Sequence, residues 1–256
     1  MKHPSLFISH GAPNTILYNS KTKDNLKQLE PLFDNAQYII MISAHWVSDK
    51  LEIINPEANS LMYDFYGFEP ELYQYKYNIQ SDKAITNKIL TKLHDKNIDI
   101  SINYERTSYD HGIWSVLSMI KKHLNIPVIQ ISLPIHYSAL ELFDLGIALQ
   151  EFREEGLIIA SGALTHNLND AKFNSKDITQ YAKKFNDEII DLLQKGDIKK
   201  LLNFHTINRF QLNHPTIEHF IPLLIAAGAS SNYKAKSINS EFQHANISME
   251  SFIFQA

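Results

Sequence analysis

Short apolar runs alternate with longer segments of helical periodicity along most of the chain. The apolar runs predict strands at residues 6–8, 38–42, 51–54, 98–102, 127–133 and 157–160. The run 38–42 is apolar throughout, which is typical of a central strand covered on both faces. The last apolar segment, 247–254, alternates in polarity and predicts a late, half-exposed strand.

The segments between these strands predict helices. They cover residues 24–33, 81–95, 113–123, 137–154, 179–194 and 217–227. In the second of these, Ile85, Ile89 and Leu93 recur at four-residue spacing and share one helix face. Ser81 is the predicted N-cap of that helix. Gly196 follows the helix 179–194 and suits a C-cap, because glycine adopts a positive φ without strain.

This alternation of strands and helices predicts an α/β fold. We expect a three-layer α/β/α arrangement around a mostly parallel central sheet, and the late strand 247–254 is expected to make the sheet mixed. No Pro/Gly-rich linker, low-complexity segment or internal repeat divides the chain. One catalytic domain is therefore expected over residues 1–256.

The composition excludes several classes of protein. The chain of 256 residues has no cysteine, so disulfides, iron–sulfur clusters and cysteine-built zinc sites are excluded. The net charge is −4 and the charged residues are interspersed, so the sequence shows no basic patch of the kind that binds nucleic acid. No apolar run reaches the roughly 18 residues of a membrane span, and the N-terminus lacks a signal-peptide core. We expect a cytoplasmic protein without a nucleic-acid or membrane partner, and the sequence leaves the oligomeric state open.

Histidine is the unusual residue type, since the chain contains 12. His10, His45 and His166 each follow a predicted buried strand. In open α/β sheets, ligand sites form beyond the carboxyl ends of the strands. Each histidine alone also suits a loop or capping role, but their shared position favours a common site. Imidazole binds iron(II), zinc, copper and nickel, so the sequence predicts a metal site at this edge of the sheet.

Two further histidines lie near predicted helix starts. His111 stands between Asp110 and Gly112, where a neighbouring carboxylate can orient its ring. His219 follows Glu218 in the first turn of the helix predicted at 217–227. A surface turn suits His111 equally well, and a helix-end role suits His219. Known motifs narrow the chemistry, because the sequence has no glycine-rich nucleotide motif, zincin helix or nucleophile elbow.

These histidines stand in motifs that resemble the class III extradiol aromatic ring-opening dioxygenases, and most closely their DOPA 4,5-dioxygenase branch. The motifs keep the family's order and spacing over nearly the whole chain. They are LFISHGAP (6–13), ISAHW (42–46), YDFYGF (63–68) with ELY (71–73), DHGIW (110–114), PVIQIS (127–132), ASG (160–162), HNL (166–168) and EHFIPLL (218–224).

The resemblance implies metal ligation by His10, His45 and His219. It leaves two roles for His166, either a fourth ligand or the base beside the metal. It implies that His111 is an acid–base residue that contacts the substrate or supports the ligands. Iron(II) is the metal implied for activity, and zinc(II) also occupies such sites.

Two features depart from the common pattern. Many mononuclear iron oxygenases use two histidines and one carboxylate, which makes Glu218 a candidate ligand, but the family pattern favours His219. Glu218 is expected to point toward helix-end amides, since consecutive helical residues project about 100° apart. Tyr66 stands where relatives often carry a second glycine, and it is expected to narrow the substrate pocket.

The implied reaction is extradiol cleavage of a catechol by dioxygen. A catechol loses protons when it chelates a metal, and a nearby histidine accepts one. A metal with open positions brings both reactants together. The aromatic residues Tyr63, Phe65, Phe68 and Trp114 are candidates for walls around the ring and equally for the core.

Two other functions fit the same histidines. A zinc-dependent hydrolase uses three histidines and an open position to activate water. A binding protein uses the same pocket without turnover. Consumption of dioxygen with a catechol and iron(II) distinguishes the dioxygenase from both, because hydrolysis proceeds with zinc and without oxygen.

Overall fold

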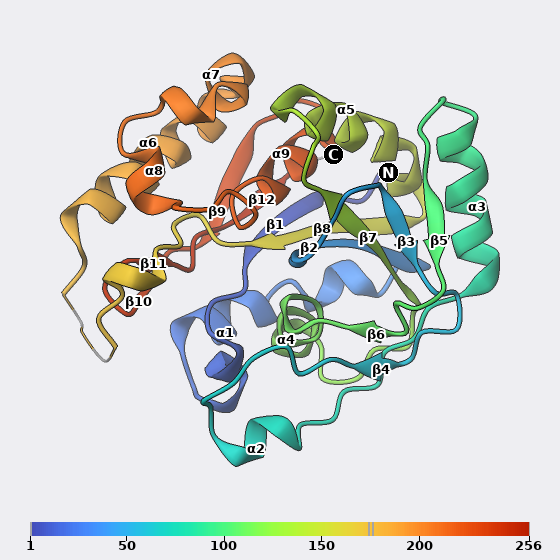
Figure 1. Ribbon diagram of the computed structural model, residues 1–256, viewed down its shortest axis with the longest axis horizontal. Coiled ribbons are helices and arrows are strands. Elements are labelled where there is room, and N and C mark those ends of the chain that lie inside the picture. The colour runs from blue at the N-terminus through green and yellow to red at the C-terminus, as the bar shows by residue number, and fades with distance from the viewer. Residues whose placement is uncertain (1, 174, 176, 256) are drawn as a thin grey trace.

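The computed structural model describes residues 2–173, 175 and 177–255. Among these residues the central sheet has eight strands in the order β5-β3-β7-β2-β8-β1-β12-β9 (Figure 1). The strands are β1 (Ser5–Ser9), β2 (Tyr38–Ser48), β3 (Glu52–Ile54), β5 (Ser101–Asn103), β7 (Val128–Pro134), β8 (Gly156–Gly162), β9 (Ala235–Asn239) and β12 (Ser251–Phe254). Two short ladders lie outside this sheet, formed by β4 (Ser60–Leu61) with β6 (Ser108–Tyr109) and by β10 (Phe242–Gln243) with β11 (Ile247–Ser248).

The centre of the sheet is parallel. Strands β7, β2, β8 and β1 run in one direction, so their carboxyl ends meet at one edge. On one side β12 is antiparallel to both β1 and β9. On the other side β3 is antiparallel to β7 and parallel to β5. The predicted mixed, mostly parallel sheet is therefore confirmed.

The late strand was predicted to be half exposed, and this is wrong. Strand β12 lies between β1 and β9 inside the sheet. The polar residues that gave the segment its alternating pattern are Ser248, Glu250 and Ser251, and all three are fully buried. Each is hydrogen-bonded, for example Ser248 Oγ to Asn186 Oδ1 at 2.5 Å, so polarity here marks internal bonding rather than exposure.

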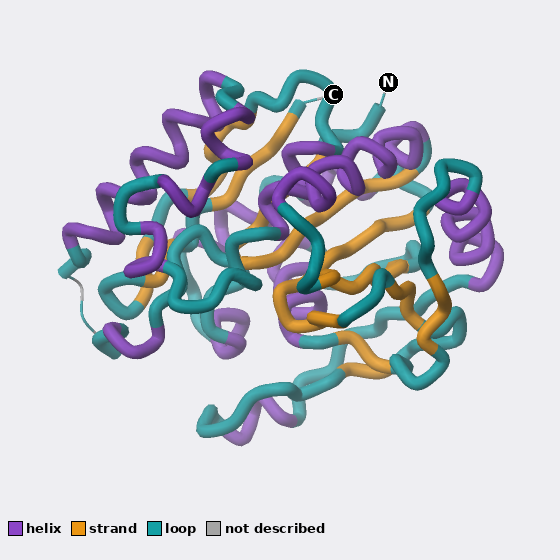
Figure 2. Tube along the Cα trace, turned by 45° about the horizontal axis from the view of Figure 1, so that its top comes forward, coloured by secondary structure: helices purple, strands orange, loops and turns teal. Residues whose placement is uncertain are grey.

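Helices cover both faces of the sheet. One face is covered by α1 (Lys21–Lys27) and α4 (His111–Ile120), where Leu26 and Trp114 pack with Ile39 of β2. The opposite face is covered by α3 (Lys83–His94), α5 (Ala139–Leu149), α6 (Gln180–Lys195) and α9 (Pro222–Gly228), which pack with Ile40 of β2. Figure 1 shows these layers below and above the sheet, and in Figure 2 α5 comes forward over the strands. The predicted three-layer α/β/α fold is confirmed.

Several helices are shorter than the segments predicted for them. The segment 24–33 divides into α1 and a 3-10 turn at Glu30–Phe33. Pro31 has no N–H to donate, so it does not continue the α-helical bonding. The segment 137–154 likewise divides into α5 and a 3-10 turn at Gln150–Glu154. Three short helices, α2 (Pro70–Tyr73), α7 (Ile198–Leu202) and α8 (Phe210–Asn213), were not predicted.

Helix ends also differ from the prediction in two places. The N-cap of α3 is Asp82 rather than Ser81, because the Asp82 carboxylate accepts the Ile85 N–H at 2.8 Å. Gly196 does end α6 with φ +71°, as predicted. Helix α9 begins only at Pro222, which is favoured in the first turn of a helix. The predicted start at residue 217 is therefore wrong, and His219 lies in the turn before the helix.

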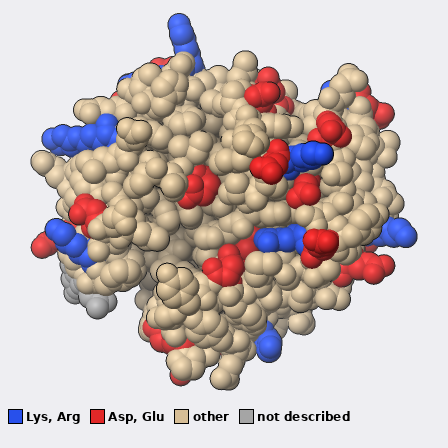
Figure 3. Space-filling view, viewed as in Figure 1, with Lys and Arg blue, Asp and Glu red and all other residues tan. Residues whose placement is uncertain are grey.

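Charge is distributed evenly over the face of the molecule in Figure 3. Acidic and basic side chains are interspersed there, in keeping with the small net charge of −4. Within the described residues, no helix combines the length and the apolar character needed to span a membrane.

Candidate metal centre

Five histidines meet at the carboxyl edge of the parallel strands. His10 follows β1, His45 lies near the end of β2, and His166 follows β8. His111 begins α4 and His219 precedes α9. The ring centroids of His10 and His45 are 4.9 Å apart, and that of His219 lies 5.3 Å and 5.1 Å from them. The structure thus brings together every histidine that the sequence singled out.

The possible ligand atoms form two adjoining groups. Atoms of His10, His45 and His111 lie within 4.8 Å of one another, and so do atoms of His166, Glu218 and His219. The His166 ring stacks on the His219 ring at 3.6 Å with an interplanar angle of 8°. The His111 ring lies 4.0 Å from that of His45. The His219 ring also lies 5.1 Å from the His45 ring, so it is the ring that joins the two groups.

His45 lies inside β2 rather than in a loop after it. The pairing of β2 with β7 shifts register between Ile42 and Val47, so the strand is irregular where His45 stands. Irregularities of this kind re-aim a side chain next to a functional site. The Ser43 hydroxyl fixes the irregularity, since it accepts the His45 N–H at 3.1 Å and donates to Asp110 at 2.6 Å.

The chain turns sharply after His10. Gly11 adopts φ +64°, a conformation that side chains disfavour. A Cβ at this position would lie 2.5 Å from the Met249 sulfur and 2.8 Å from Gln243 Oε1. The His10 backbone N–H donates to Gly162 O at 3.0 Å, which ties this turn to the end of β8.

The three predicted ligands present their rings in the same way. Each Nδ1 faces an oxygen, which fixes ring orientation and leaves Nε2 for the centre. The pairs are His10 with Ser161 Oγ at 2.9 Å, His45 with Asp64 Oδ2 at 3.4 Å, and His219 with Glu218 Oε1 at 2.9 Å. The Nε2 atoms of His10 and His45 are 3.1 Å apart. The Nε2 atom of His219 is buried and has no hydrogen-bond partner among the described residues.

This geometry fits a single divalent metal. A metal–nitrogen distance of about 2.1 Å with ligands about 90–110° apart gives neighbouring ring centroids about 4.6–5.3 Å apart. The three measured separations run from 4.9 to 5.3 Å. The same metal–nitrogen distance puts two Nε2 atoms about 3.0–3.4 Å apart, and His10 and His45 show 3.1 Å. A metal also gives the unpaired Nε2 of His219 its missing partner.

Burial keeps these rings neutral, which is the form that binds a metal. Burial lowers the pKa of His45 and of His166 to about 4. Burial and the neighbouring imidazoles lower the pKa of His10 and His219 well below the usual value.

Asp64 connects two of the histidines, and no sequence pattern singled it out. Its Oδ1 accepts the backbone N–H of His111 at 3.0 Å and lies 2.9 Å from His111 Nδ1, while Oδ2 faces His45. Burial raises the pKa of Asp64, but the bonds to His111 outweigh it and lower the pKa to about 2. Asp64 belongs to the YDFYGF motif, but only the folded chain reveals the rings it faces.

A buried ion pair supports the same side of the site. Asp110 is fully buried and accepts hydrogen bonds from Ser43 at 2.6 Å, Gln130 at 2.6 Å and Arg106 at 2.8 Å. The Arg106 guanidinium also lies over the Trp46 ring at 5.0 Å. These contacts join β2, β7 and the start of α4 beneath His45 and His111.

His214 is a further buried histidine, and no sequence pattern assigned it a role. Its Nε2 donates to Leu164 O at 2.8 Å. The neighbouring Asn213 carbonyl accepts the His166 N–H at 2.9 Å. These two bonds hold the segment that carries His166. Burial lowers the pKa of His214 to about 3.

Glu218 does not bind helix-end amides, and this prediction is wrong. Residue 218 lies in a turn, so no helix end is present there. Instead its Oε1 accepts the Thr216 hydroxyl at 2.8 Å and faces His219 Nδ1. Glu218 therefore orients the ring beside it.

The candidate aromatic residues have different positions. Trp114 is fully buried and donates to Met62 O, so it belongs to the core. Phe65 meets the His111 ring edge to face at 5.6 Å and lies 5.5 Å from Phe68, which places an aromatic wall beside the histidines. Tyr66 is 92% exposed, so it does not fill this space as expected.

The fold and the histidine cluster define an α/β enzyme with a metal site at the carboxyl edge of its sheet. The family model described as the catalytic LigB subunit of aromatic ring-opening dioxygenase matches residues 3–255. The chain belongs to this family and is a metal-dependent extradiol dioxygenase. The resemblance identified from the motifs is thereby confirmed, and a zinc-dependent hydrolase is not supported.

Curated relatives cover most of the chain. A protein from Beta vulgaris named 4,5-DOPA dioxygenase extradiol is 31% identical over 256 residues, which are 98% of this chain and 96% of that protein. A protein of the same name from Escherichia coli K12 is 30% identical over 88% of this chain and 84% of its own. A crystal structure of an uncharacterized protein from Escherichia coli K12 superimposes with a TM-score of 0.84 at 25% identity, covering 99% of this chain and all of the other.

Gly162 sets the position of His219. A Cβ at Gly162 would overlap with the His219 carbonyl oxygen. We predict that Gly162→Ala destabilises the protein by about 1–3 kcal/mol and also weakens metal affinity, because the His219 backbone must shift. Gly146→Ala is the matched control, since its Cβ would overlap with the Ile225 carbonyl, away from the rings. Denaturant unfolding and metal titration of both variants test this, and equal metal affinities would contradict it.

His214 makes stability depend on pH. Its pKa is about 3 in the folded protein against 6.5 as the usual value, so unfolding takes up a proton between these limits. Stability that is present above pH 6.5 is therefore lost as the pH falls. For one proton the slope is about 1.4 kcal/mol per pH unit. The variant His214→Gln keeps a donor for Leu164 O but does not titrate. We predict that, in the metal-free protein, it reduces the pH dependence of the unfolding free energy by this amount, measured by urea unfolding at pH 5–6. An unchanged slope would show that His214 does not titrate on unfolding.

Proposed function

We propose that this chain opens the ring of a DOPA-like catechol with dioxygen, with iron(II) held by His10, His45 and His219. The observation that carries the proposal is the triangle formed by the rings of His10, His45 and His219. The buried Nε2 of His219 has no hydrogen-bond partner among the described residues. The relatives named 4,5-DOPA dioxygenase extradiol support the substrate class. The family match over residues 3–255 supports one catalytic domain.

Iron(II) is favoured over zinc(II) because ring opening by dioxygen needs a redox-active metal. Bound iron(II) supplies open coordination positions and electron transfer, whereas zinc supplies only Lewis acidity. Three neutral imidazoles fit either ion and leave its positive charge uncompensated, which favours a catecholate over a neutral catechol.

Of its two possible roles, His166 is proposed to be the base rather than a fourth ligand. A catechol and dioxygen together need open positions, and a fixed fourth histidine would take one of them. Burial lowers the pKa of His166 to about 4, so its ring is unprotonated at pH 7, which is the form that a base requires. Stacking on His219 holds it beside the centre.

His111 is proposed to be a second acid–base group. Asp64 engages its Nδ1, so Nε2 is the atom left for a substrate oxygen. Phe65 packs against the same ring and offers an apolar surface for the aromatic substrate. The catechol would thus lie between a proton acceptor on the His166 side and His111 on the other.

The ligand assignment predicts which variants lose metal. Replacing His219 by Ala removes a ligand, so metal and activity should be lost together, and His45→Ala should behave in the same way. Glu218→Gln keeps the ring and changes only its orienting partner, so metal affinity should fall by about 10- to 100-fold. Metal content after dialysis checks both, and stoichiometric metal in His219→Ala would show that His219 is not a ligand.

The role of His166 predicts a different outcome. His166→Gln should retain iron(II) near the wild-type level, because the base does not hold the metal. Turnover should fall by roughly 10²–10⁴-fold, the usual span for a general base. Anaerobic catechol binding should shift to higher pH, since the catechol must then lose its proton without help. Loss of most of the iron would mean that His166 is a structural ligand, and the base would then be His111.

The activity itself is tested by oxygen uptake. Iron(II)-loaded and zinc(II)-loaded protein are compared across a panel of substituted catechols. We expect oxygen consumption and a yellow muconic semialdehyde-type product only with iron. Absence of oxygen uptake with every catechol would contradict the proposed substrate class.

A further inference from the structure

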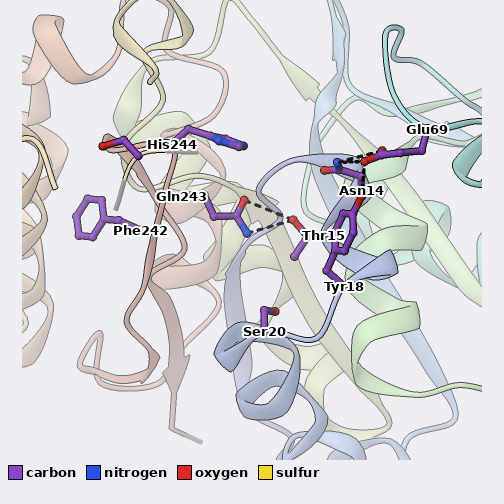
Figure 4. Close-up of a pocket in the computed structure, with 9 residues that line it drawn as sticks. Asn14, Thr15, Tyr18, Ser20, Glu69, Phe242, Gln243 and His244 are labelled. Atoms are coloured by element: carbon purple, nitrogen blue, oxygen red, sulfur yellow. Dashed lines mark hydrogen bonds between the residues drawn. The ribbon is translucent and has the colours of Figure 1, made fainter. Parts of the chain in front are cut away.

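A cavity lies beside the loop that follows His10, and no role has so far been given to it. Its volume is about 370 Å³ (Figure 4). It lies between the segment after His10, represented by Asn14 and Tyr18, and the β10 segment with Gln243 and His244. Glu69 forms part of its rim.

The walls of this cavity continue the segments that carry the site. Asn14 lies four residues after His10, and Glu69 lies five residues after Asp64. Gln243 Oε1 accepts the Ala12 N–H at 3.4 Å. The same oxygen lies so close to Gly11, the neighbour of His10, that a Cβ there would be 2.8 Å from it. The cavity therefore lies beside the loop that follows His10 and the segment that follows Asp64.

Glu69 gives the cavity its charge. Among the described residues that line it, Glu69 is the one that carries a formal charge at pH 7. The Asn14 amide donates to both carboxylate oxygens, at 3.2 and 3.1 Å, and the Tyr18 hydroxyl donates to Oε1. The bond from Tyr18 lowers the pKa of Glu69, so the carboxylate stays ionised.

These donors hold the carboxylate in one orientation while leaving it room for another partner. A carboxylate has about four acceptor positions on its two oxygens, and the donors from Asn14 and Tyr18 occupy three of them. A fixed anion at the edge of a cavity favours a cationic ligand, because an ammonium group donates three hydrogen bonds and balances the charge.

We propose that this cavity is the subsite for the substituent of the catechol, and that Glu69 selects substrates whose substituent carries a protonated amine. The inference rests on the proposed function, since it concerns the part of the substrate that lies outside the metal centre. It predicts discrimination between catechols that share the same ring and differ only in the charge of the side chain.

The test compares three probes with iron(II)-loaded protein. They are 3,4-dihydroxyphenethylamine with an ammonium group, 4-ethylcatechol without charge, and 3,4-dihydroxyphenylacetate with a carboxylate. For wild type we expect kcat/KM for the amine to exceed that for the neutral catechol by about five- to tenfold, the range of a charge-assisted bond near the surface.

Variants of Glu69 should change the order of kcat/KM among the three probes. Glu69→Gln should bring the ratio of amine to neutral catechol close to one, and Glu69→Lys should make the carboxylate probe the preferred one. Glu71→Gln is the matched control, because it removes the same charge from a neighbouring residue of α2 that does not line the cavity. Its ratio should equal that of wild type.

Two failures are distinguishable. If no catechol consumes oxygen, the proposed function is wrong, and anaerobic binding of the three probes to wild type and Glu69→Gln then decides the inference from the ratio of dissociation constants. If the neutral catechol is cleaved but wild type shows no preference for the amine, or Glu69→Gln keeps it, the inference is overturned.

Discussion

The burial of several imidazoles at one edge of the sheet is the constraint on which the site depends. Rings out of water are costly to protonate, so His10 and His219 are held neutral. Each Nδ1 faces an oxygen of the protein, and the Nε2 atoms of His10 and His45 face one another at 3.1 Å. The buried Nε2 of His219 has no hydrogen-bond partner among the described residues, and a bound metal would supply one. Stability and metal binding are thus linked through the same atoms.

The fold meets this constraint by joining segments that are far apart in the sequence. Parallel strands β1, β2 and β8 end together, which places His10 and His45 side by side. The third ring comes from the turn before α9, which reaches the site because the Ala163 N–H donates to His219 O at 2.9 Å and Gly162 leaves room for it. Carboxylates then orient the rings from behind, Asp64 on one side and Glu218 on the other.

Strand periodicity was enough to predict the fold class and the edge where His10, His45 and His166 meet, because these features depend on local pattern. The resemblance was needed to include His219, whose helical setting was predicted wrongly. Asp64 and His214 act through contacts with residues distant in sequence, and no local pattern indicates such contacts. The buried strand β12 was misjudged for the same reason, since the partners of its polar residues are known only in the folded chain.

The central claim is that His10, His45 and His219, rather than His111, surround one iron. A crystal structure of the iron(II)-loaded protein with anomalous data at the iron edge tests it most directly. We expect a single peak within about 2.0–2.5 Å of the Nε2 atoms of these three histidines, with His166 outside bonding distance. A peak bonded to His10, His45 and His111, with His219 unligated, would contradict it.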